Sequence, residues 1–130
     1  MGLDIYAKGL VNQEDPEMPF CSIGYIGYSL IMKKLARIAY GDEMGDLYDD
    51  YHHIWTQADC DFWDARCNGD LDLLLFHSDC DGKFTPKECR RVYDAIKDFH
   101  LDHERLNAYL EKFKTAFKHC AERRVNLYYG

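Results

Sequence analysis

Apolar and polar side chains alternate across residues 2–7 and again across residues 124–129. This period of two is typical of a β-strand with one buried face. A lone strand would leave its backbone N–H and C=O groups without partners. We therefore expect residues 124–129 to pair with residues 2–7 in a small sheet that packs on helices.

Between the two ends, apolar residues recur at helical spacing. The predicted fold is mainly α (α+β), with about four to five helices and a small sheet formed by the N- and C-terminal strands. We expect helices in the ranges 28–39, 42–55, 59–67, 86–99 and 102–120, with a further two turns over 70–76. Gly41 and the pair Asn68-Gly69 are expected stops, and Asp42, Asp59 and Asp102 expected starts.

The helical period also predicts which side chains face the core. The residues expected there are Tyr28, Ile31, Met32, Leu35, Ile38, Ala39, Met44, Leu47, Tyr48, Tyr51, Ile54, Trp55, Phe62 or Trp63, Cys89, Val92, Tyr93, Ile96, Phe99, Leu106, Tyr109, Leu110, Phe113, Phe117 and Cys120.

Composition places the chain among folded proteins. The 130 residues are 47% hydrophobic and 15% aromatic, which argues against disorder, and residues 1–130 are expected to form one domain. No stretch approaches 18 apolar residues, so we expect no membrane association. The N-terminus lacks a basic segment followed by an apolar run, which predicts a cytoplasmic protein.

The six cysteines do not form a zinc-binding pattern, since no Cys-x-x-Cys occurs. In a cytoplasmic protein thiols stay reduced. Cys89 and Cys120 fall on apolar helix faces and are expected to be reduced core residues.

Charge is unevenly distributed along the chain. Residues 41–81 hold twelve Asp and Glu but only one basic residue, Arg66. Nucleic-acid binding needs a basic footprint, so we expect no nucleic-acid partner. An acidic middle attracts cations or a basic protein partner, although a solvated helix face explains the same charges. The identity of a protein partner is not encoded in this pattern.

The segment His77–Glu88, with the sequence HSDCDGKFTPKE, carries the densest candidate chemistry. Its spacing resembles the calcium loop of EF-hand proteins, which has ligands at positions 1, 3, 5, 7, 9 and 12 and Gly at position 6. That resemblance implies a metal site formed by His77, Asp79, Asp81, the Lys83 carbonyl, Thr85 and Glu88.

His77 stands where the EF-hand family has Asp, and its nitrogen suits Mn²⁺ as well as Ca²⁺. Zinc ranks lower, because His77 and Cys80 supply two ligands and the sequence contains no second pair.

A structural explanation of the same segment competes with the metal site. Thr85, Pro86 and Glu88 form a capping box, with Thr85 as N-cap, Pro86 at N1 and Glu88 at N3. Asp81-Gly82 is then an ordinary turn in which Gly82 takes a positive φ. We favour this turn over the metal site.

A second resemblance spans the chain in order. The N-terminal GLDIY, the segment CSIGY at residues 21–25 and the hexad HSDCDG at residues 77–82 resemble a family of small bacterial and phage proteins without an established activity. The resemblance implies one intact domain and no particular mechanism.

Three classes of function remain open. The favoured one is a non-enzymatic interaction or binding module in which HSDCDG is a structural turn. The second is a module that binds a divalent cation. The third is an enzyme, either a metal-dependent hydrolase using Asp79 and Asp81 or a thiol enzyme using Cys80 beside His77. The two flanking carboxylates disfavour the thiolate that a thiol enzyme needs.

Overall fold

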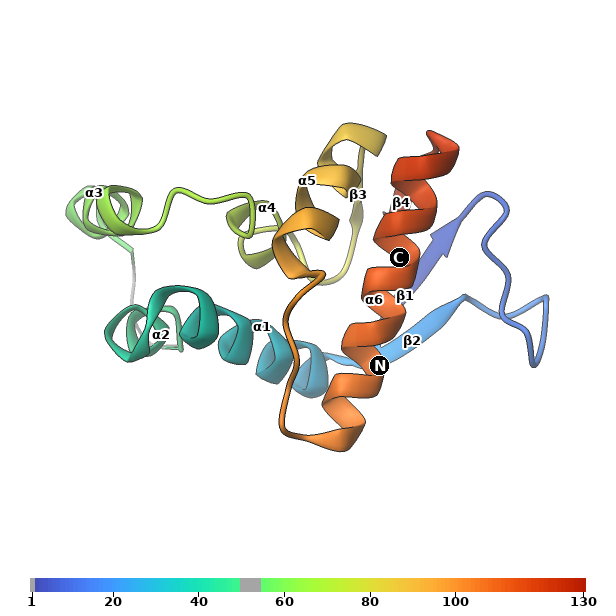
Figure 1. Ribbon diagram of the computed structural model, residues 1–130, viewed down its shortest axis with the longest axis horizontal. Helices are drawn as coiled ribbons and strands as arrows, with labels where there is room; N and C mark the ends of the chain where they lie inside the picture. Colours follow the sequence, from blue (N-terminus) through green and yellow to red (C-terminus); the bar gives the residue numbers. More distant parts are fainter. Residues whose placement is uncertain (1, 50–54) are drawn as a thin grey trace.

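The computed structural model describes residues 2–49 and 55–130 and shows an α+β fold (Figure 1). In chain order the elements are β1 (Gly2–Ala7), β2 (Cys21–Gly24), α1 (Tyr25–Tyr40), α2 (Asp42–Asp49), α3 (Gln57–Arg66), α4 (Asp72–Leu75), β3 (Gly82–Phe84), α5 (Pro86–Ile96), α6 (Glu104–Arg123) and β4 (Leu127–Tyr129).

The two ends of the chain pair as the alternating pattern predicts. Ile5 lies opposite Tyr129 and Ala7 opposite Leu127 in an antiparallel ladder. The sheet is larger than expected, because β2 joins the free edge of β1 and β3 joins the free edge of β4. The strand order is therefore β2-β1-β4-β3, with both terminal strands at the centre.

One face of this sheet lies in the core. The side chains of Leu3, Ile5 and Leu127 are fully buried, whereas Tyr6 and Tyr128 point to the other, exposed face. Helix α6 contacts β2 and β4, and α1 contacts β1 and β2, so these two helices cover the sheet (Figure 1). None of the helices within the described residues combines the length and apolar character that a bilayer span requires.

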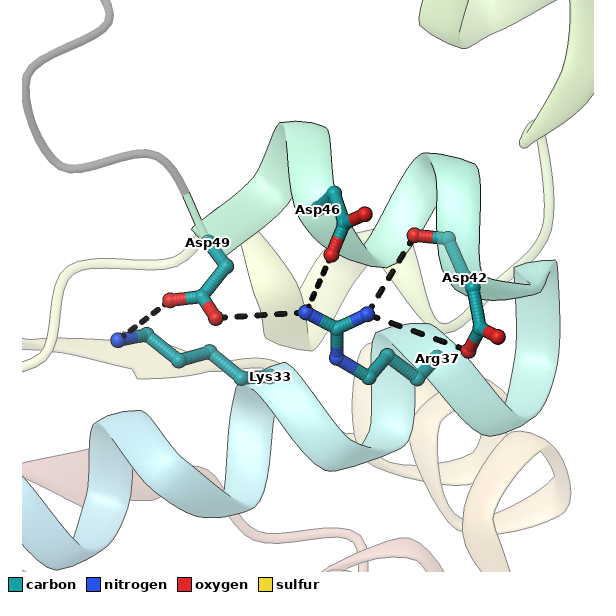
Figure 2. A network of polar contacts seen from close by, with 5 residues as sticks. All are labelled: Lys33, Arg37, Asp42, Asp46 and Asp49. Carbon is teal, nitrogen blue, oxygen red and sulfur yellow. Dashed lines mark hydrogen bonds and ion pairs between the residues drawn. The ribbon is translucent and has the colours of Figure 1, made fainter.

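A charged network joins α1 to α2 (Figure 2). The Arg37 guanidinium lies 2.6 Å from Asp46 and 3.5 Å from Asp49, and Lys33 lies 2.7 Å from the other oxygen of Asp49. These cations, Lys33 first, lower the pKa of Asp49. Asp42, Asp46 and Asp49 of α2 thus lie against Lys33 and Arg37 of α1.

Helix α1 differs from its prediction at both ends of its inner face. It begins at Tyr25, because β2 continues directly into the helix. Ile38 and Ala39 were expected in the core, but both are exposed, and Ala36 is buried in their place. Helical geometry keeps position 39 on the same face as positions 28, 32 and 35, so the buried part of this face ends at Ala36, one turn before the helix ends at Tyr40.

The predicted helix 42–55 is only partly visible. Helix α2 ends at Asp49 within the described residues, and Trp55 lies outside any helix. Tyr51 and Ile54 lie outside the described residues. Met44 is buried as predicted, and Leu47 and Tyr48 pack against the core.

Three helix boundaries differ from the prediction, two of them because another residue is the N-cap. Thr56 rather than Asp59 begins α3, and the Asp59 side chain closes a capping box with it. His103 rather than Asp102 caps α6, since its Nδ1 accepts the Leu106 N–H at 3.2 Å. Helix α5 ends at Ile96, so Phe99 lies beyond it and is half-buried.

Other predicted positions agree with the structure. Trp63, not Phe62, is the buried aromatic residue of α3. All six cysteines are free, and Cys89 and Cys120 are fully buried, as expected for reduced core thiols. A hydrogen bond to Cys120, and then burial, raise the pKa of Cys89.

Candidate functional site

The predicted capping box at the start of α5 is present. The Thr85 hydroxyl accepts the Glu88 N–H at 3.3 Å, and Glu88 Oε1 accepts the Thr85 N–H at 2.9 Å. Pro86 occupies the first turn, where its missing N–H costs no hydrogen bond. Thr85 and Glu88, two of the predicted metal ligands, are therefore engaged in capping the helix.

His77 packs against the core side of the same turn. Its ring stacks on Phe84 with centroids 4.0 Å apart and meets the edge of Tyr129 at 5.2 Å. Its Nδ1 lies 2.8 Å from the Ser78 carbonyl oxygen and its Nε2 lies 3.1 Å from the Lys83 carbonyl oxygen. Both ring nitrogens therefore face backbone acceptors within the turn.

The two aspartates of the hexad do not converge with His77 and Glu88. Asp81 Oδ1 accepts a hydrogen bond from the Ser78 hydroxyl at 2.7 Å, and Asp79 is exposed. Gly82 has φ +97°, as the turn requires, and leads into the short strand β3. No group of three or more His, Cys, Asp or Glu side chains within residues 2–49 and 55–130 is arranged to hold a metal ion. Metal binding by His77, Asp79, Asp81, Lys83, Thr85 and Glu88 stays a prediction.

The pairing of Cys80 with His77 that a thiol enzyme needs is not formed. Cys80 Sγ lies 3.5 Å from the Ser78 hydroxyl and 3.9 Å from Asp81 Oδ1. The nitrogens of His77 point at carbonyl oxygens instead. A nucleophilic thiol requires a base within hydrogen-bond reach, and this turn directs the imidazole elsewhere.

A cavity of about 640 Å³ lies outside the hexad, beside α3 and α4. This volume falls within the range of small-molecule sites. Aromatic, aliphatic, polar and charged side chains share its lining: Trp55, Cys60, Trp63, Asp64, Asn68, Gly69, Asp72, Leu73, Phe76 and Arg91. We refer to it as the tryptophan pocket, because it is lined by both tryptophans of the chain.

Three rings of the tryptophan pocket pack edge to face. The ring centroids of Trp55, Trp63 and Phe76 are 5.3–5.7 Å apart, and their planes meet at 67–89°. Trp63 is buried, whereas the Phe76 side chain is 51% exposed at the edge of the pocket. The walls are therefore a mostly apolar surface with an exposed aromatic rim.

Asp72 is the polar centre of the tryptophan pocket. Its Oδ2 accepts the indole N–H of Trp63 at 3.0 Å, and its Oδ1 accepts the Tyr40 hydroxyl at 2.8 Å. Burial raises the pKa of Asp72, although these two hydrogen bonds act in the opposite direction. Among the described residues, no Lys or Arg forms an ion pair with this half-buried carboxylate.

The negative charge of Asp72 helps to raise the pKa values of two neighbouring groups. The pKa of Tyr40 is raised by burial and by its hydrogen bond to Asp72. Burial and then the Asp72 charge raise the pKa of Cys67 to about 11, so this thiol is protonated at neutral pH. Both neighbours are therefore neutral and supply no counter-charge.

Arg91 of α5 is the basic side chain among the described residues that line the tryptophan pocket, and it is already paired. Its Nε donates to Asp70 Oδ1 at 2.9 Å, and its Nη2 lies 2.8 Å from the same oxygen. Asp64, the second acidic residue in the lining, is exposed. The charge lining the pocket is thus negative once the Arg91–Asp70 pair is formed.

The sequence pattern does not predict this pocket, because its residues come from three helices and their connections. Trp63 was expected only as a core residue. One signal was available: Asp72 interrupts the apolar run Leu71–Phe76. A carboxylate inside such a run must be satisfied by partners from elsewhere in the fold, here Trp63 and Tyr40.

Comparison of the chain with family models, with curated proteins and with solved structures found no match.

Proposed function

We propose that the chain is a non-enzymatic binding module that takes its ligand into the tryptophan pocket, while the HSDCDG turn is structural. The observation that carries this proposal is a cavity of about 640 Å³ with aromatic walls and one half-buried carboxylate. Apolar walls with few convergent polar groups are typical of ligand sites. We also propose that the chain belongs to the family of small bacterial and phage proteins that its motifs resemble.

The contacts that its side chains already make support a structural role for the turn. Glu88 and Thr85 cap α5, and His77 stacks on Phe84 and covers Tyr129. Each of these contacts fixes the short strand β3 against β4 or the start of α5. Substituting these residues should therefore change stability before it changes ligand binding.

A fragment screen by thermal shift tests the proposed pocket. Cys60→Phe fills the pocket from α3, and Arg105→Phe adds the same ring at an exposed position of α6. Fragments that stabilise the wild type should lose their effect on Cys60→Phe and keep it on Arg105→Phe. Equal stabilisation of both variants, or no stabilising fragment at all, would contradict the proposal.

Divalent-cation binding by the segment His77–Glu88 is the second candidate function. One observation favours it: His77 Nε2 and the Lys83 carbonyl oxygen, expected at positions 1 and 7 of the loop, lie 3.1 Å apart. A cation would have to replace this contact and withdraw Glu88 from the cap. The effect of metals on the melting temperature, described in the Discussion, distinguishes the two functions.

A further inference from the structure

We infer that the tryptophan pocket binds an organic cation, an ammonium or guanidinium group carried on an apolar or aromatic body. The inference rests on the proposed function and adds the chemical class of the ligand. Its basis is the combination of a half-buried carboxylate with an apolar aromatic wall in one cavity.

The charge balance of the lining favours a cation. Asp72 and Asp64 both line the cavity, and Arg91 is bound to Asp70 at 2.8 Å. A carboxylate held away from water is costly unless it is paired. Asp72 receives two neutral hydrogen bonds from Trp63 and Tyr40 and no cation from the described residues. A bound ammonium would provide the missing counter-charge.

The hydrogen bonds to Asp72 leave it able to accept more. A carboxylate has about four lone-pair sites on its two oxygens, and Trp63 and Tyr40 occupy one on each. These two donors also fix the orientation of the carboxylate, so a ligand meets a preorganised group. Charge-assisted hydrogen bonds from an ammonium are shorter and stronger than those from a neutral hydroxyl.

The aromatic walls complement the rest of such a ligand. Phe76 is exposed at the rim and packs edge to face against Trp55 and Trp63. Aromatic faces attract cations and also bury alkyl or aryl groups. An anion would meet two carboxylates and would have to break the Arg91–Asp70 pair, so the pocket discriminates against it.

Three probes that share a phenylethyl body and differ in the charge of the terminal group test the charge preference by titration calorimetry: 2-phenylethylamine, 2-phenylethanol and 3-phenylpropanoate. The wild type should bind the amine at least about tenfold more tightly than the alcohol, and the carboxylate most weakly. Asp72→Asn should bring the ratio of amine to alcohol affinity close to one. Asp61→Asn, which removes a charge from α3 outside the pocket lining, should leave the ratio unchanged.

A capped lysine, Nα-acetyl-lysine N-methylamide, separates the two sources of such a cation. Tighter binding of the capped lysine than of 2-phenylethylamine assigns the site to a protein side chain, and the reverse order assigns it to a free amine. Either order supports the inference.

Equal affinity of the wild type for amine and alcohol, or a preference for 3-phenylpropanoate, would overturn the cation inference and leave the proposed function intact. If fragments bind the pocket in the screen above but none of the probes binds, the cation inference is likewise overturned and the proposed function is left intact. An empty fragment screen would instead overturn the proposed function itself. The wild-type comparison needs no variant, so a folding defect in Asp72→Asn leaves the test decisive.

Discussion

The imidazole ring of His77 stacks on the phenyl ring of Phe84 with centroids 4.0 Å apart and an angle of 23° between the planes. Phe84 is fully buried and also contacts the rings of Phe117 and Tyr129. The first residue of the hexad therefore packs over the core beside Phe84 and Tyr129.

Removing the His77 ring should destabilise the protein. His77→Ala is expected to lower the free energy of unfolding by about 1 kcal/mol, because the stacked pair is lost and Phe84 is exposed. His77→Phe keeps the ring and should recover most of that loss. His100→Ala, at an exposed histidine, serves as the control in urea unfolding. A His77→Ala variant as stable as this control would contradict the packing role.

Gly82 is the second position at which the turn is testable. Its φ of +97° is disfavoured for residues with a Cβ, and an added Cβ would lie 3.1 Å from the His77 ring. Gly82→Ala should therefore destabilise by more than about 1 kcal/mol. Gly24→Ala is the matched control, since its φ is −62° and a Cβ there meets no atom within 4 Å. Equal unfolding midpoints for the two variants would show that the turn tolerates a side chain.

Much of the fold follows from local patterns in the sequence. The caps by Thr85 and Gly41 were predictable, because each depends on neighbouring residues alone. The pairing of the end strands was predictable because both ends alternate and a lone strand lacks backbone partners. Strand β3 was not predicted, since three residues show no alternation and the strand exists only through its pairing with Leu127–Tyr129. The same limit applies to the tryptophan pocket, whose carboxylate and rings meet only in the folded chain.

The divalent-cation alternative is tested by thermal unfolding at pH 7.5. A ligand that binds only the folded state at a hundredfold excess over Kd stabilises it by about 2.7 kcal/mol. We expect Ca²⁺ and Mn²⁺ at millimolar concentration to leave the melting temperature unchanged, because Glu88 and His77 are engaged within the turn. A rise that disappears in Asp81→Asn would establish the cation site and displace the turn.

The pH dependence of stability should reveal the burial of Asp72. Its pKa is raised in the folded state, so the folded protein holds this proton more tightly than the unfolded chain. The resulting stabilisation is complete below the unfolded pKa of about 3.9 and is lost as the pH rises through the folded pKa. The free energy of unfolding of Asp72→Asn relative to that of the wild type, measured in urea, should therefore be higher at pH 7 than at pH 4.

Asp49 provides a control of opposite sign. Lys33 and then Arg37 lower its pKa, so its contribution is present above the unfolded pKa and is lost as the pH falls through the folded pKa. The free energy of unfolding of Asp49→Asn relative to that of the wild type should therefore be lower at pH 7 than at pH 4. The same sign for both variants would contradict the assignment of Asp72 as a half-buried carboxylate that has no ion pair among the described residues.

The central claim is that the chain binds its ligand in the tryptophan pocket and not at the hexad. Titration of ¹⁵N-labelled protein with 2-phenylethylamine tests it most directly, because the only two indole N–H signals come from Trp55 and Trp63. We predict that both indole signals shift in a saturable manner while the amide signal of Gly82 stays in place. Saturable shifts at Gly82 with unmoved indole signals would contradict the claim.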